Sequence, residues 1–158
     1  MCMMLYLASD SPLPEIEWDE RNPAFHVTSQ LHPKAVAVRE SFTKAHVYYV
    51  GSDQKCGCGF GYCTDDEYRS DYRNHPDLIE KALEENERGR ENVRRLREYL
   101  EAALESGPVD LYAVQAGSEG IEPEKRLQVG PAYFGGDTFV FGRGQFITVR
   151  KDLTSLGL

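Results

Sequence analysis

The chain has 158 residues, of which 41% are hydrophobic and 28% are charged, a balance that predicts one globular domain with its own core over residues 1–158. Its net charge of −8 disfavours binding to the phosphate backbone of a nucleic acid and to an anionic membrane surface.

The N-terminal residues 2–8 form a continuously apolar run that Ser9 to Pro12 end, which predicts a strand buried on both faces. The run is too short for a membrane span, and it lacks the basic start and the cleavage site of a signal peptide. We therefore expect a cytoplasmic protein, in which the four cysteines are thiols or metal ligands rather than disulfides. In the proline-rich loop 11–24, Trp18 either folds back over the core or stacks on a ligand.

Two strands and one short helix are predicted next. Residues 25–27 and 46–51 have the β-branched and aromatic content of strands. Pro33 suits the first turn of a helix over about 33–43, although the alternating Ala-Val-Ala-Val run inside it is equally compatible with a strand.

A long helix over about 76–106 is the strongest secondary-structure prediction. Asn74 is the expected N-cap, Asp77 completes a capping box, and Gly107 with Pro108 ends the helix. Residues 93–104 are expected to pack on the sheet, whereas the first half of the helix is exposed, bent near Gly89 or paired with another subunit. Its interleaved arginines and glutamates predict a solvated face with ion pairs, or alternatively a surface for an acidic partner.

The last third is predicted to be rich in strands. Residues 109–115 and 127–129 have strand composition, and residues 138–141 and 145–150 resemble a hairpin joined through two glycines. Residues 65–74, by contrast, are expected to form a solvated acidic turn. Together these elements predict a single-domain α+β fold, in which one long helix and one short helix pack on a mixed or antiparallel sheet.

The segment from Cys56 to Cys63 is where chemistry is expected, because three cysteines and three glycines alternate within it directly after the strand 46–51. Thiolate is the form of cysteine that attacks electrophiles and binds metals. Cys58 and Cys63 can accompany Cys56, and Cys2 can supply a fourth sulfur if the N-terminal strand lies beside the strand 46–51. Four thiolates form a closed tetrahedral site, which is the usual structural zinc site.

Other interpretations of the same segment remain open. The spacing is not the paired Cys-x-x-Cys arrangement typical of structural zinc, so the cysteines can also be small buried residues or a reactive thiol pair. A second hypothesis is a non-catalytic interaction module or homodimer that uses the helix 76–106. A third is an enzyme with a small-molecule pocket formed by His46, Tyr48, Tyr49 and Asp65. No motif selects a reaction.

Overall fold

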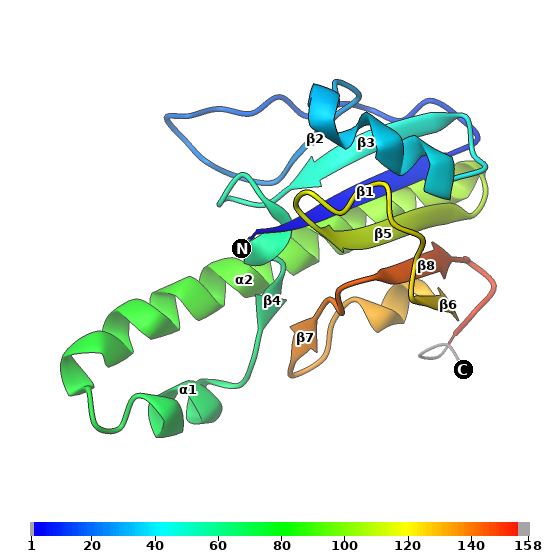
Figure 1. Cartoon of the computed structure of the whole chain (residues 1–158). Helices are drawn as coiled ribbons and strands as arrows, with labels where there is room; N and C mark the ends of the chain where they lie inside the picture. Colours follow the sequence, from blue (N-terminus) through cyan, green and yellow to red (C-terminus); the bar gives the residue numbers. More distant parts are fainter. Residues whose placement is uncertain (1, 155–158) are drawn as a thin grey trace.

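The computed structural model describes residues 2–154 and shows a mixed six-stranded sheet with helices against it, as predicted (Figure 1). The strand order is β2-β3-β1-β5-β8-β6, and every neighbouring pair is antiparallel except β6 and β8, which run parallel. The α+β prediction is therefore confirmed. The strands of this sheet are β1 (Met3–Ser9), β2 (His26–Thr28), β3 (His46–Gly51), β5 (Val109–Gln115), β6 (Lys125–Val129) and β8 (Gln145–Val149).

The long helix is α2, which spans Pro76–Ala103 and continues as the 3-10 turn η3 over Leu104–Ser106, as predicted. Its C-terminal half lies against the sheet, whereas its N-terminal half extends beyond the sheet edge beside the short helix α1 (Asp65–Asp71) (Figure 1). The predicted short helix is the 3-10 helix η1 (Pro33–Ser41), so this run of alternating alanine and valine is not a strand. Among the described residues, no helix is both long and apolar enough to cross a membrane.

The sheet is buried on both faces because its central strands are apolar at consecutive positions. In β1, Leu5 and Leu7 point into the cluster beneath α2, whereas Tyr6 and Ala8 point into the cluster beneath η1. This two-sided burial explains the continuous apolar run at the N-terminus. The α2 side also contains Val93, Leu96, Leu100, Leu111 and Ile147, and the η1 side contains Ala35, Val38, Phe42, Tyr112 and Phe146.

The solvent-facing side of α2 carries the predicted ion pairs. Glu91 contacts both Arg94 and Arg95, and the contact with Arg95 is an i,i+4 pair at 3.0 Å. These two guanidinium groups lower the pKa of Glu91 to about 2. The buried side of the helix packs inside its own chain. A homodimer or partner surface on α2 stays a prediction, and it would have to use the exposed side of the helix.

The predicted C-terminal hairpin is wrong. Its first part, β7 (Phe139–Val140), pairs with β4 (Gly61–Tyr62) in a separate two-stranded sheet, whereas β8 pairs with β5 and β6. Two contacts outweigh the local turn signal. The ring of Phe139 packs against those of Phe134 and Phe141, and the amide of Gly144 donates to the carbonyl of Ala113 in β5 at 2.8 Å.

The acidic segment after the cysteines is helical rather than a turn. Thr64 caps α1, with its hydroxyl accepting from the Glu67 amide while the Glu67 carboxylate accepts from the Thr64 amide. The capping box expected at Asn74 does not form, because His75 is the N-cap of α2 and provides no side-chain bond. Pro76 begins that helix without an amide that needs a partner.

The middle of α2 contacts β4 at a distance that only glycine allows. A Cβ atom placed on Gly89 would lie 2.0 Å from the carbonyl oxygen of Gly61, and no flexible side chain is there to move away. Gly89 is buried, as are the neighbouring helical residues Asn86 and Asn92. The helical region around Gly89, which was expected to be weak or bent, is therefore the place where α2 packs closely against the backbone of β4.

The substitution Gly89→Ala tests this contact. In an exposed helix it would stabilise by about 1 kcal/mol, but here the added methyl group overpacks the interface. We expect a loss of about 1–3 kcal/mol of unfolding free energy in urea denaturation. The exposed Glu84→Ala on the same helix is the control and should change stability by less than about 0.5 kcal/mol. A neutral or stabilising Gly89→Ala would contradict the close contact.

Candidate metal or thiol site

Three of the four cysteines lie together in space. The Sγ atoms of Cys2, Cys56 and Cys58 are all within 4.8 Å of one another. Cys2 precedes β1, and the other two follow β3. The antiparallel register that pairs Leu5 with Val50 therefore brings the start of one strand to the end of the other. This is the strand pairing on which the predicted contribution of Cys2 depended, and it is confirmed.

The turn before Cys56 is held by its own backbone and by Tyr49. The amide and the hydroxyl of Ser52 both donate to the carbonyl of Cys56, at 3.0 and 2.7 Å. Lys55 has a φ of 70°, in the left-handed region that side chains rarely adopt, and its carbonyl accepts from the Tyr49 hydroxyl at 2.5 Å. These bonds set the direction in which Cys56 leaves the turn.

Gly57 lets this loop lie directly on β1. A Cβ atom at this position would be 3.0 Å from the carbonyl oxygen of Met3 and 3.3 Å from the amide nitrogen of Leu5. The neighbouring Sγ of Cys58 accepts a hydrogen bond from the Met3 amide at 3.2 Å. Gly57 thus allows the backbone of the cysteine loop to lie close to the backbone of β1. This contact brings the sulfurs of Cys56 and Cys58 near Cys2.

The other side of the loop is fixed to α2 by a buried asparagine. The side-chain oxygen of Asn92 accepts from the Asp53 amide at 3.3 Å, and its nitrogen donates to the Asp53 carboxylate at 2.7 Å and to the Gly59 carbonyl at 3.1 Å. One side chain therefore ties together both ends of the segment that carries Cys56 and Cys58. A polar residue at a core-facing helical position was the signal in the sequence for this role.

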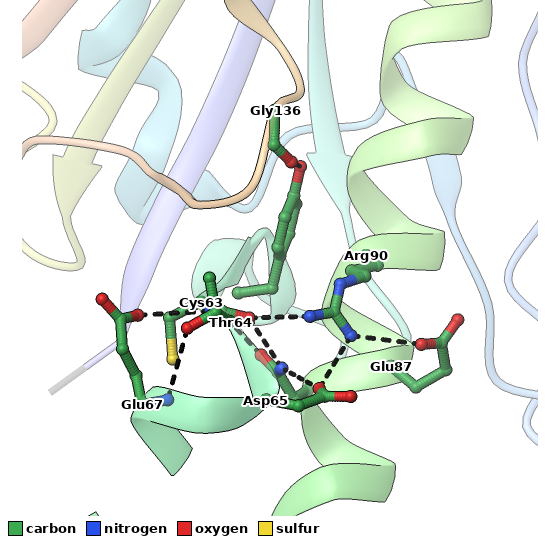
Figure 2. Close-up of polar contacts among 9 residues, drawn as sticks. Cys63, Thr64, Asp65, Glu67, Glu87, Arg90 and Gly136 are labelled. Carbon is green, nitrogen blue, oxygen red and sulfur yellow. Dashed lines mark hydrogen bonds and ion pairs between the residues drawn. The ribbon is translucent and has the colours of Figure 1, made fainter. Parts of the chain in front are cut away.

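Cys63 does not belong to the group of three sulfurs. Its amide donates to the side-chain oxygen of Asn86 at 3.0 Å, and its carbonyl accepts from Asn86 and from Arg90, each at 2.8 Å. Figure 2 shows these contacts, with Arg90 reaching from α2 to Asp65 and Glu87 as well. Cys63 thus lies where β4 leads into α1, with its backbone bound to α2.

The cysteine sulfurs differ in proton affinity. Burial alone would raise the pKa of Cys58, but hydrogen bonds from the Met3 amide and from the Cys56 and Cys2 thiols lower it below the ordinary cysteine value. Burial raises the pKa of Cys56 to about 12, and the nearby Cys58 and Cys2 add to the increase. Burial and the neighbouring Glu67 raise the pKa of Cys63. Of these three cysteines, Cys58 is therefore the one that loses its proton most readily.

The exposure of the cluster excludes plain core packing for these sulfurs. Cys2 and Cys58 are exposed and Cys56 is half-buried, whereas a cysteine that serves as a small hydrophobic residue is buried. Three sulfurs that face one another from one side also leave room for a further ligand from solvent. The arrangement can hold a thiophilic metal ion or form a reactive thiol pair.

The other candidate residues lie apart from one another. Tyr48 is in the core beneath α2, where its hydroxyl accepts from the Leu13 amide at 2.8 Å, whereas Tyr49 packs on the opposite face of the sheet. His46 pairs with Ser9, at the end of β3 remote from the cysteines, and Asp65 bonds to Asn86 and Arg90. A pocket formed by these four residues finds no support in the described chain.

Trp18 covers the edge strand β2. Its ring packs on His26 with 4.6 Å between the ring centroids, and the Lys55 ammonium lies 5.7 Å from the centre of the indole. Trp18 thus folds back over the edge of the sheet, whereas the expectation placed it over the core, and it belongs to neither core cluster. The loop 11–24 thereby reaches the turn that precedes Cys56.

The substitution Asn92→Ala tests how the cysteine loop is held. It leaves the Asp53 amide and the Gly59 carbonyl without their side-chain partner, which should cost about 2–4 kcal/mol of unfolding free energy. Faster hydrogen exchange of amides in residues 53–59 should accompany the loss. The exposed Asn22, whose side chain makes no hydrogen bond to any other residue between 2 and 154, provides the control Asn22→Ala, for which no measurable change is expected. Equal effects of the two substitutions would contradict this role for Asn92.

Comparisons with known proteins add no relative to this picture. No protein-family model, no curated protein and no solved structure matches the chain.

Proposed function

We propose that the protein binds a thiophilic metal ion, zinc in particular, through Cys2, Cys56 and Cys58. The observation that supports this most directly is the set of three Sγ atoms within 4.8 Å of one another. Zinc bound to thiolates at ~2.3 Å in tetrahedral geometry requires sulfurs ~3.8 Å apart. The limit of 4.8 Å is about 1 Å above that spacing.

The chemistry of the donors also favours this choice. Thiolate is a soft ligand that selects zinc, copper(I) and iron–sulfur clusters over magnesium or calcium. Three protein sulfurs leave the fourth position of a tetrahedral ion to water or to a ligand from outside the group. Cys2 and Cys58 are exposed, so this position is on the solvent side of the site. The proposed site is therefore open, in contrast to the closed four-thiolate site that the sequence led us to expect.

Zinc at this position would join the residue before β1 to the loop after β3. A ligand that binds only the folded chain adds about 2.7 kcal/mol of stability when its concentration is 100 times its dissociation constant. The proposed role is thus partly structural. It secures the start of the central strand β1, where the cysteine loop lies on Met3.

Zinc stoichiometry in matched cysteine variants tests the proposal. Protein purified without a histidine tag should bind about one equivalent of zinc, and Cys2→Ser, Cys56→Ser and Cys58→Ser should each lose most of that affinity. Cys63→Ser is the matched control and should bind as the parent protein does. Less than about one tenth of an equivalent in the parent, together with a melting temperature that is the same with zinc and with chelator, would refute the metal site.

The affinity for zinc should also decrease as the pH is lowered. Thiolates bind the metal, and the pKa of Cys56 is about 12, so binding at neutral pH must release at least its proton. Each released proton weakens binding by about tenfold for every pH unit of acidification. Competition titrations with a chromogenic chelator at two pH values measure this slope. A pH-independent affinity would mean that the thiols are not the ligands.

A second candidate function is thiol chemistry at the same cluster. The observation that favours it is the contrast between Cys58, whose pKa is lowered, and Cys56, whose pKa is raised. An exposed cysteine of lowered pKa beside one of raised pKa is the arrangement of a nucleophilic cysteine with a resolving partner. A bound metal draws electron density from the thiolates and lowers their nucleophilicity, so metal binding should suppress thiol reactivity at this cluster.

The order of alkylation tests this second candidate. In the metal-free protein near neutral pH, iodoacetamide should modify Cys58 before Cys56 and Cys63, because only the thiolate reacts and the pKa values of the other two are raised. Peptide mass spectrometry at short reaction times measures the order. Equal rates at Cys58 and Cys63 would show that the Met3 amide does not activate Cys58. Added zinc should protect Cys58 and leave Cys63 unprotected.

A further inference from the structure

A second site is suggested by a polar cavity at the opposite end of β1 from the cysteines. The cavity has a volume of about 660 Å³ and lies between the end of η1, the loop 120–123 and the strands β5, β6 and β8. Ala8 of β1 pairs with Asp110 of β5 at this end, whereas Cys2 precedes the other end of β1. A cavity of this size matches the clefts that hold small molecules. It shares no lining residue with the cysteine cluster.

The unusual residue in this cavity is Asp110. It lies on the face of β5 that carries Tyr112 and Val114, and its side chain is only 7% exposed. One carboxylate oxygen accepts from the Thr148 hydroxyl at 2.8 Å. The other is 3.7 Å from the Lys44 ammonium, which is too far for a hydrogen bond. This oxygen therefore has an ion-pair partner but no close hydrogen-bond donor, and it keeps hydrogen-bonding capacity toward the cavity that Asp110 lines.

The other buried carboxylate among the described residues shows what a purely structural role looks like. Both oxygens of Glu119 have close partners, since one accepts from the Tyr6 hydroxyl at 3.1 Å and the other from the Gly117 amide at 2.8 Å. Asp110 has a close partner on one oxygen only. The difference distinguishes a carboxylate that completes the fold from one that faces a cavity with bonding capacity left.

Lys44 has the complementary property. Its side chain is 17% exposed, and its ammonium lies 3.7 Å from Asp110 and 3.8 Å from Asp10, so neither carboxylate accepts a hydrogen bond from it. The ammonium therefore keeps its donors available to the cavity. Arg126 lines the same cavity, with its guanidinium 4.6 Å from the ring centre of Phe146. Cationic donors and an anionic acceptor thus line the same cavity.

We propose that this cavity binds a small zwitterion of the free amino-acid class. The ligand carboxylate would accept hydrogen bonds from Lys44, and the ligand ammonium would donate to the free oxygen of Asp110. Two cations and three carboxylates line the cavity, so a ligand with a single charge of either sign would leave the opposite charge of the Lys44–Asp110 pair without a close partner. A zwitterion bonds to both. Its side chain would extend along Phe146 and Arg126.

Calorimetric titration of the whole chain with each of the twenty common amino acids tests the proposal. At least one should give saturable binding with a dissociation constant below about 1 mM. The N-acetylated and the methyl-ester forms of that amino acid each lack one charge, and each should bind at least about tenfold more weakly. This comparison uses the unaltered protein, so it does not depend on whether a variant folds.

Variants then locate the site. Lys44→Met and Asp110→Asn should each weaken binding by about tenfold or more. Lys151→Met and Asp152→Asn, at exposed ion pairs elsewhere, are the matched controls and should bind as the parent does. The inference is overturned if no amino acid binds with a dissociation constant below about 1 mM, if a charge-deleted form binds equally well, or if both cavity variants fold and keep the parent affinity. Zinc binding by the cysteines is unaffected by any of these outcomes.

Discussion

The contact between the middle of α2 and the glycine-rich loop is the constraint on which the rest of the structure depends. Gly89 lets the helix backbone meet the carbonyl of Gly61, and the buried Asn86 and Asn92 on either side bind the loop through their amides. Without these bonds, the loop polar groups would be buried without partners. The helix thereby holds the cysteine loop from one side while β1 holds it from the other.

The local sequence pattern was enough to predict the elements that are determined by residues close to one another in the chain. The strand 46–51 and the helix 76–106 are of this kind, because β-branched content and a proline–glycine boundary act within a few residues. The C-terminal hairpin was predicted wrongly because Phe139 finds its partners in other segments. Cys63 could not be separated from its neighbours by spacing, since only the tertiary bond to Asn86 shows that its backbone turns toward α2.

Both candidate sites lie at ends of the same central strand, where an apolar sheet meets polar loops. The middle of β1 is buried on both faces and offers no room for chemistry. Its ends differ in kind: sulfur ligands border the first and charged oxygen and nitrogen groups border the second. The soft sulfur ligands and the hard oxygen and nitrogen groups are thus separated by the length of one strand, so the two proposed sites can bind ligands of different chemistry.

The pairing of β1 with β3 also determines when the cysteine cluster comes into existence. Cys2 precedes its partners Cys56 and Cys58 by more than fifty positions, so it is synthesised well before them. The three sulfurs therefore meet only after both strands have been synthesised and have aligned. A metal ion at this cluster would therefore bind only after β1 and β3 have paired in their native register. Its binding would then stabilise the N-terminal part of the sheet.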